Sequence, residues 1–534
     1  MAVTVPNEGS ATSIELAPMP AGAISADASK ITLTAPKSDE ALREVEEERR
    51  AVSTQITAIV ITCVTFSTGI QSFLAGLVTI TIPTVAVDLS LPDNLVLWPV
   101  TIYSLTCGCT LLACGSISDV VGNRQTYLLG CLLQTAFTLG CGLSTTGAQL
   151  IVFRGFSGVA ASFCLPSAVS LINEVFPTGR SRNISFAAMG GAQPVGFGLG
   201  LTLGGIIAAK IGWQWGFHAA AIINFVMLFL AAWQLPRNEY PSARVIGQRL
   251  LNDIDWVGVI IASTSLAILS YVIAAIAGSP TAIRSPTNIS LLILSFIVLA
   301  IFVLWVGRQE RLNRPALIPN SLWRHKVFSC ICINVFCVWA AFNAFEQFQN
   351  FFFQEIQHIS PFDSALRFLP MPVAGALANI LVGLIVHRVR ADWIVIITLI
   401  PSAIAPLLMA LASPKWPYWS CAFIANFLNP IGADGIFTVS NLLITSMFPP
   451  KTQGVAGGVF NTVSQTGKSV GIALTALVAN GVTQKSGKGG ADETGALLEG
   501  YRAAFWFEFA LTVASLGVSI WGLGRIGKVG RKMD

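Results

Sequence analysis

The sequence predicts an all-α integral membrane protein that crosses the bilayer about fourteen times, because long apolar segments recur along almost its whole length. Its 534 residues are 53% hydrophobic and only 11% charged, whereas about a quarter of the residues in soluble domains are charged. A helix of about 20 apolar residues spans the ~30 Å hydrocarbon core. Each such segment is therefore expected to be a spanning helix.

The apolar segments form two blocks of about six with an extra pair between them. The first block is placed at 57–87, 98–117, 126–143, 150–173, 187–210 and 217–235. The extra pair is placed at 256–277 and 289–306. The second block is placed at 327–353, 365–386, 393–411, 416–447, 455–482 and 503–523. The predicted fold therefore consists of two pseudo-symmetric six-helix bundles, one from each block, plus two inserted helices.

Polar segments flank these blocks and divide the chain into five predicted parts. The first part cannot be a signal peptide, because it lacks an apolar core near its start. The parts are a disordered cytosolic tail over 1–54, an N-terminal six-helix bundle over 55–236, two inserted helices with cytosolic loops over 237–326, a C-terminal six-helix bundle over 327–524 and a basic cytosolic tail over 525–534.

Basic residues predict the orientation, because they are retained on the cytosolic side. The loops assigned to the inside carry most of them, including Arg124, Arg180, Arg182, Arg237, Arg244, Arg249, Arg308, Arg311, Arg314, Arg324, Lys326, Arg388 and Arg390. The outside loops carry chiefly Lys210, Arg284, Lys415, Lys485 and Lys488. Both termini are therefore expected in the cytosol, with the protein in the cell membrane and the vacuolar membrane as the alternative.

Several functional classes are excluded by what the sequence lacks. The eleven cysteines lie mostly in apolar segments without a CxxC pair, and the net charge of +5 is spread over loops. No Walker loop, GxSxG elbow or HxxxH cluster is present. We therefore expect that the protein is not an enzyme and that it has no metal site or cofactor. The expected partners are a small-molecule substrate and the lipid bilayer, and nucleic acid is not expected to bind. The protein is expected to function as a monomer.

The loop after the second span combines glycines with one charge of each sign. The residues that define it are Gly115, Asp119, Gly122 and Arg124. Glycines permit a tight cytosolic turn, although an ordinary turn between two spans is an alternative. The loop resembles the signature of the major facilitator superfamily, with Val120 and Asn123 where basic residues are usual. The resemblance implies a two-bundle transporter fold and a gating role for this loop, with its core charge pair retained.

The fourth span contains an arginine followed by small residues. A buried arginine is costly in a bilayer, so Arg154 is a functional candidate. Snorkelling to the nearby outer surface is the alternative. Arg154 and Gly158 resemble the RxxxG motif of the superfamily, which implies a role in proton coupling.

The fifth span has a glycine face that predicts close helix packing. The glycines are Gly196, Gly200, Gly204 and Gly205. The stretch resembles a motif of exporters in the superfamily, with Leu201 where a proline is usual and Pro194 as a nearby source of a kink. A faded copy of the first loop signature, from Gly383 to Arg388 with His387 replacing the aspartate, indicates an internal repeat. The extra pair resembles the insertion of fourteen-helix drug:proton antiporters.

The ninth span carries a polar stripe among phenylalanines, at helical spacing. Glu346 is the first candidate for proton coupling, because burial favours the protonated form of a carboxylic acid, while a purely structural hydrogen-bonded acid is the alternative. Asp434 and Lys468 also fall inside spans and are candidates to pair with each other and, with Arg154, to couple protons. Glu508 lies nearer the outer end of the last span and is interpreted as a snorkelling or interfacial residue. The predicted substrate-binding residues are Gln193, Trp339, Asn343, Glu346, Asn350, Asn461 and Gln465.

The substrate and direction are inferred from further resemblances. Leu74 holds the place where drug:proton antiporters of this size usually carry an aspartate, which favours a neutral or anionic, partly apolar substrate over a lipophilic cation. The segments 91–99 and 460–465 resemble the fungal branch of aminotriazole-resistance-like and toxin or secondary-metabolite exporters. This implies proton-driven efflux, with the proton gradient as energy source and rocking of the two bundles about a central site.

Two alternatives remain for the function. The same fold supports uniport or proton symport of a nutrient or small ion into the cell, and a non-transporting membrane sensor is the other. Asn288 begins a formal glycosylation sequon on the predicted outer side, close to the membrane.

Overall fold

The computed structural model describes residues 39–176, 180–235, 243–278, 280–386, 388–448, 450–490 and 492–524, and in these ranges it contains helices and no strand. The chain divides into two units, Met1–Thr54 and Gln55–Asp534. Helix α1 (Asp39–Asp88) begins in the first unit and continues in the second. The predicted N-terminal tail is thus helical over 39–54. Its first 38 residues, His387 and the predicted basic tail over 525–534 lie outside the described residues.

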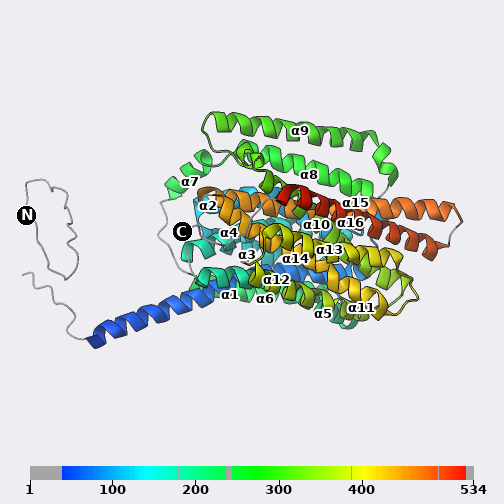
Figure 1. Cartoon of the computed structure of the whole chain (residues 1–534), viewed down its shortest axis with the longest axis horizontal. Coiled ribbons are helices and arrows are strands. Elements are labelled where there is room, and N and C mark those ends of the chain that lie inside the picture. The colour runs from blue at the N-terminus through cyan, green and yellow to red at the C-terminus, as the bar shows by residue number, and fades with distance from the viewer. Residues whose placement is uncertain are drawn as a thin grey trace, which may run out of the picture. The chain divides into compact units, whose positions relative to one another are not determined.

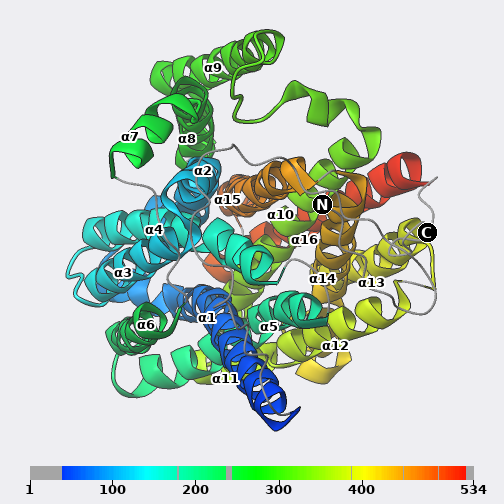
Figure 2. The ribbon, with the colours of Figure 1, turned by 90° about the vertical axis from the view of Figure 1, so that its left-hand side faces the viewer.

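The first half of the second unit contains the rest of α1 and the five helices that follow it. Their bounds are α2 (Trp98–Val121), α3 (Asn123–Gly142), α4 (Gly147–Val175), α5 (Arg180–Lys210) and α6 (Gln214–Gln234). Helix α4 packs between α2 and α3, and α3 also packs on α6. The view along the helices in Figure 2 shows α2, α3, α4 and α6 on the same side of the unit.

A pair of helices between the halves, α8 (Trp256–Gly278) and α9 (Pro286–Arg311), packs as a hairpin preceded by the short helix α7 (Ala243–Asn252). Helix α8 contacts α2 of the first half and α15 of the second, while α9 lies outermost (Figure 1). Apolar side chains of α9 such as Phe296 and Leu304 are exposed. These side chains are suited to face lipid, where exposure of apolar surface carries no penalty.

The second half contains the remaining helices of the chain. Their bounds are α10 (Lys326–Phe351), α11 (Pro361–Phe368), α12 (Pro370–Ile385), α13 (Ala391–Leu411), α14 (Ala422–Met447), α15 (Pro450–Lys488) and α16 (Glu493–Leu523). A π-helical turn, Phe352–Ile356, follows α10. Helix α10 packs on α15 and α16, and α15 also packs on α2, which joins the two halves.

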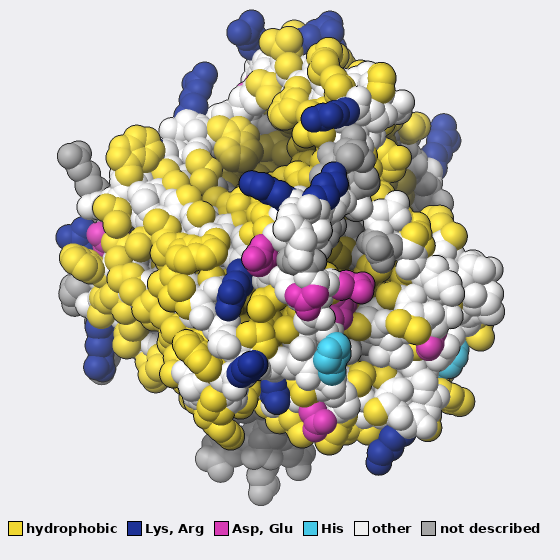
Figure 3. Space-filling model, turned by 90° about the vertical axis from the view of Figure 1, so that its right-hand side faces the viewer, with side chains coloured by type: hydrophobic (Ala, Val, Ile, Leu, Met, Phe, Trp, Pro, Cys, Tyr) yellow, Lys and Arg dark blue, Asp and Glu magenta, His cyan; other side chains and the backbone are white. Residues whose placement is uncertain are grey.

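Twelve helices in the described part of the chain are long and apolar enough to cross a membrane. Every predicted span has a helix in the structure, but α3 and α15 are not among these twelve, so the count of fourteen is not confirmed. Helix α15 owes its lower hydropathy to residues such as Asn461, Gln465 and Lys468. The end of the bundle in Figure 3 carries charged side chains of both signs between hydrophobic ones, as expected at a membrane surface.

Helices α1 and α5 approach so closely that only glycine fits at their contact. A Cβ atom at Gly196 would clash with the carbonyl oxygen of Gly69, and one at Gly200 with that of Phe73. A Cβ at Gly204 would lie 2.9 Å from Leu77 Cδ1. Gly205 faces the other way, toward α11, where a Cβ would lie 2.9 Å from Ala365 Cβ. The glycine face therefore holds α1 in place beside the site described next.

Candidate functional site

A cavity of about 100 Å³ lies between the two halves of the second unit. Its wall is formed by α1, α2, α4 and α5 from the first half and by α10, α14 and α15 from the second. Arg154 comes from the first half, while Glu346 and Lys468 come from the second. A site shared by two bundles in this way changes its access when the bundles tilt against each other.

Most residues predicted to bind substrate line this cavity. They are Gln193, Trp339, Asn343, Glu346, Asn461 and Gln465. Asn350, the remaining predicted residue, does not line the cavity and is fully buried. The stripe on α10 therefore divides between Glu346, inside the cavity, and Asn350, one turn further along the helix.

Polar residues of α1 and α2 also line the cavity, and the sequence-based prediction did not include them. On α1 they are Thr68, Gln71, Ser72 and Thr79, and on α2 they are Tyr103 and Ser104. The α1 residues recur at helical spacing, which is the signal that could have identified them. Leu74, in contrast, is buried in the hydrophobic core and does not line the cavity.

Arg154 is buried on α4, with only 3% of its surface exposed, so the snorkelling alternative is wrong. Its Nε atom donates a hydrogen bond to the carbonyl oxygen of Pro99 at 2.9 Å. Its guanidinium carbon lies 4.5 Å from the ring centre of Tyr103, within cation–π range. These two contacts fix the side chain at the cavity wall.

Lys468 does not pair with Asp434, which corrects the expectation from sequence. Its Nζ atom lies 4.4 Å from the ring centre of Trp339. Asp434 accepts a hydrogen bond from Asn379 Nδ2 at 3.0 Å and does not line the cavity. In the described part of the chain no ion pair joins Arg154, Lys468 or Glu346 to a partner.

Several polar atoms at the cavity are buried without a hydrogen-bond partner in the structure. Two are N–H donors, Trp339 Nε1 and Gln347 Nε2, and two are acceptors, Glu346 Oε1 and Gln465 Oε1. Buried polar groups in proteins are almost always paired, and an unpaired one is costly. Such atoms around a cavity are therefore available to a bound solute or to water.

Glu508 is fully buried on α16, and neither carboxyl oxygen has a hydrogen-bond partner in the structure. The expectation that it is interfacial is wrong. Sequence position alone suggested exposure because Glu508 lies near the predicted outer end of its span, but α16 packs against α10, α13 and α15. Glu508 does not line the cavity.

Beyond one end of the cavity, a hydrogen-bonded contact joins α1 to α10. Pro83 lies inside α1 and has no N–H, so the helix supplies no donor to the carbonyl oxygen of Thr79, four residues earlier. Asn350 Nδ2 fills this vacancy from the other half, at 2.7 Å. Gln354 Nε2 adds a bond to the carbonyl oxygen of Ile80 at 3.0 Å.

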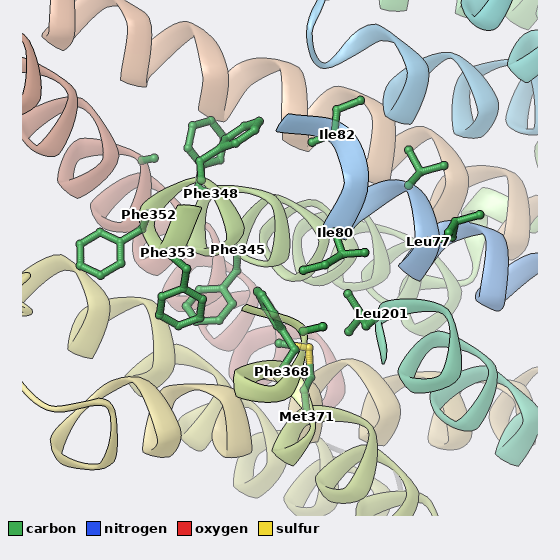
Figure 4. Packing of buried hydrophobic residues seen from close by; sticks show 14 of the residues in the cluster. Leu77, Ile80, Ile82, Leu201, Phe345, Phe348, Phe352, Phe353, Phe368 and Met371 are labelled. Carbon is green, nitrogen blue, oxygen red and sulfur yellow. The ribbon is translucent and has the colours of Figure 1, made fainter. Parts of the chain in front are cut away.

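The side-chain oxygen of Asn350 is paired as well, because it accepts hydrogen bonds from Gln354 Nε2 at 2.7 Å and from Ser364 Oγ at 3.0 Å. Around this contact lies a cluster of large apolar side chains from both halves (Figure 4). Its labelled members include Leu77, Ile80, Phe345, Phe348, Phe352, Phe353 and Phe368. We call the hydrogen bonds of Asn350 and Gln354 together with this cluster the seam.

The predicted gating loop has an arrangement that sequence comparison did not suggest. Arg124 donates to the carbonyl oxygens of Ala232 at 2.7 Å and Leu235 at 3.2 Å, so it caps the end of α6. No ion pair between Asp119 and Arg124 is formed, and Asp119 is exposed. The expected core charge pair is therefore absent.

The turn itself depends on a glycine and on the residue that departs from the signature. Gly122 has φ 111°, a conformation that favours glycine. Asn123 accepts a hydrogen bond from Ser118 Oγ and donates to Glu174 Oε2, both at 2.9 Å, which links the ends of α2 and α4. A Cβ at Gly115 would lie 3.6 Å from Pro166 Cβ, an ordinary contact.

Asn288, the predicted glycosylation position, lies in the first turn of α9. Its Nδ2 atom donates to the carbonyl oxygen of Ala282 at 2.9 Å. A glycan would replace only one of the two hydrogens on this nitrogen, so this bond by itself does not exclude glycosylation.

The match to a family model defines the class of this protein. Residues 64–472 match the model of the Major Facilitator Superfamily, and the chain belongs to this family of membrane transporters. Its similarity extends to a crystal structure of the nucleoside transporter NupG, with a TM-score of 0.57 at 11% identity, covering 88% of this chain and 99% of that one. That likeness supports the fold.

The curated relatives of this chain include fungal transporters with different names. MFS-type transporter 1 of Pyricularia oryzae is 42% identical, over 85% of this chain and 82% of the relative. Efflux pump terJ of Aspergillus terreus is 25% identical, over 88% of each chain. The low affinity ammonium transporter of Saccharomyces cerevisiae is also 25% identical, over 80% of this chain and 79% of the relative.

Proposed function

We propose that this protein is a proton-coupled transporter that exports a small organic compound through the cavity between its two halves. The observation that carries the proposal is the cavity wall, where Arg154 of one half faces the same space as Glu346 and Lys468 of the other. A buried carboxyl group with a free oxygen is suited to take up and release a proton. The direction is supported by the similarity to a protein named as an efflux pump.

The proposal includes fourteen spans, with α3 and α15 crossing the membrane as well. Each is a helix of 20 residues or more that packs along neighbouring spans, α3 on α4 and α15 on α10. With this count and the positive loops inside, both termini are cytosolic. The seam then lies at the outer end of the cavity, because α1 enters from the cytosol and reaches Pro83 close to its far end.

The second candidate function is uptake of a small cation such as ammonium, which the similarity to the low affinity ammonium transporter favours. The charges at the cavity argue against it. Arg154 and Lys468 both line the space, and only Glu346 opposes them with a negative charge. A small cation would meet two positive groups in a site from which water is partly excluded, where repulsion is strong.

The test compares cells with and without the protein. Untargeted mass spectrometry should find a small organic compound that accumulates inside cells lacking it. The same compound should then leave wild-type cells and move across membrane vesicles that contain the purified protein. Depletion of the compound in the deletion cells would indicate uptake instead, and vesicle transport that is insensitive to collapse of the pH gradient would exclude proton coupling.

A further inference from the structure

We propose that the cavity is a binding site for an organic anion, held by Arg154 of α4 and Lys468 of α15. The two cationic side chains come from opposite halves and line the same space. Arg154 uses Nε for the bond to Pro99 and has its remaining N–H groups for a ligand. Lys468 has three N–H donors, and in the described part of the chain no carboxylate lies within ion-pair distance of it.

The physical reason is the excess of positive charge at the cavity, where two cationic side chains face a single carboxyl group. Arg154 is only 3% exposed, and Lys468 is half-buried at the cavity wall. Each rests on an aromatic ring, at 4.4 Å for Lys468 on Trp339 and 4.5 Å for Arg154 on Tyr103. A cation–π contact offsets only part of the lost hydration, so an anion that enters the cavity would balance the second positive charge.

The rest of the wall indicates an organic anion with an apolar body. Apolar side chains, among them Phe197 of α5 and Phe437 of α14, alternate with amides around the space. The free N–H groups of Trp339 and Gln347 add neutral donors for acceptor oxygens. A planar carboxylate attached to a small hydrophobic group matches this set, because Arg binds carboxylate oxygens through parallel N–H bonds.

This inference rests on the proposed function only in taking the cavity as the solute site, and it bears on how protonation of Glu346 affects binding. A proton on Glu346 removes the one negative charge that opposes an anion there, so proton and anion binding favour each other. The charged or titratable groups around Glu346 are Lys468 on α15, Arg154 on α4, Tyr103 on α2, and Asp434 on α14 behind the wall.

The experiment uses three planar probes of almost the same shape that differ in charge: benzoate, benzamide and benzamidine. Full-length protein in lipid nanodiscs is assayed with radiolabelled benzoate at low salt, and the other probes and chloride serve as competitors. Benzoate should bind at least tenfold more tightly than benzamide, and benzamidine should compete more weakly still. Benzamidine that binds as tightly as benzoate, or no measurable benzoate binding by folded protein, would overturn the inference. Chloride that competes as well as benzoate would overturn the organic character of the anion.

Variants identify the residues involved. Lys468→Gln should weaken benzoate binding at least tenfold and remove the preference over benzamide, whereas Lys468→Arg should keep both. Lys415→Gln, at an exposed lysine outside the cavity, is the matched control and should bind as wild type does. Arg154→Lys tests the other cation while keeping its charge, and it should retain more affinity than Lys468→Gln. Unchanged benzoate affinity in folded Lys468→Gln would contradict the role of this lysine.

The coupling and the transport function have separate readouts. Benzoate affinity should rise as the pH falls from 7.5 to about 5.5, and Glu346→Gln should bind benzoate with no such dependence. Affinity that falls with acidification would contradict the joint binding of proton and anion. If benzoate binds as predicted but vesicles with the protein move neither benzoate nor the cellular compound, the transport proposal fails and the anion site stands.

Discussion

The cavity and the seam both include residues of α1 and α10, but their polar groups differ in hydrogen bonding. Glu346 and Asn350 are four residues apart on α10. At the cavity the Glu346 oxygen Oε1 has no partner, whereas every side-chain polar atom of Asn350 is bonded, including a bond across to α1. The difference indicates that the seam stabilises the fold, whereas the cavity keeps polar atoms that a solute can bond.

The largest effect on stability should follow from truncating a large apolar side chain of the seam. Phe345 is fully buried in the cluster, so Phe345→Ala should lower the free energy of unfolding by about 3–5 kcal/mol, since the surrounding side chains cannot close the gap. Denaturant unfolding in mixed micelles measures this. Phe229→Ala, at a side chain 65% exposed, should cost less than about 1 kcal/mol. Equal losses would contradict the distinction between the seam and the outer surface.

A smaller effect should follow from removing the amide of the seam. Asn350→Leu keeps the size of the side chain but leaves the Thr79 carbonyl oxygen without a donor, so we expect a loss of about 1–3 kcal/mol. The control is Asn343→Leu, at a cavity amide that donates only to Trp339 on its own helix. It should stay within about 0.5 kcal/mol of wild type. The comparison between seam and cavity fails if both amides cost the same stability.

A substitution at the cavity should reduce transport without lowering the stability of the fold. Glu346→Gln removes the titratable group but keeps its shape, and it should reduce pH-driven transport of the cellular compound at least tenfold, equivalent to about 1.4 kcal/mol. The unfolding temperature should not fall, because a neutral amide is easier to bury than a carboxyl group that can ionise. Glu493→Gln, at an exposed acid, is the control. Full pH-driven transport by Glu346→Gln would exclude it as the coupling residue.

The smallest effect is a coupling between Pro83 and Asn350. Pro83→Ala restores an N–H that can bond to the Thr79 carbonyl oxygen, which then no longer depends on Asn350. The loss caused by Asn350→Leu should therefore shrink by about 0.5–1 kcal/mol in the Pro83→Ala background. A double-mutant cycle measures this. Additive losses would show that Pro83 is not the reason why the Thr79 carbonyl oxygen depends on Asn350.

The sequence by itself determined the class of fold and much of the candidate site. Long apolar segments have only one stable form in lipid, the helix, so the positions of the spans followed from composition. A polar side chain in such a segment is tolerated only where it faces the interior, which is why Glu346, Asn343 and Gln465 could be assigned to a common site before their contacts were known.

Only the tertiary structure decided which partner each polar group has. Lys468 contacts the ring of Trp339 and does not pair with Asp434. Arg124 bonds to the end of α6 and does not pair with Asp119. Glu508 is buried because three helices cover it. Helical periodicity gives the face of a residue on its own helix but neither the rotation of the neighbouring helix nor its depth. The bond from Asn350 to Thr79 spans 271 positions of the chain, and no local pattern relates two residues so far apart.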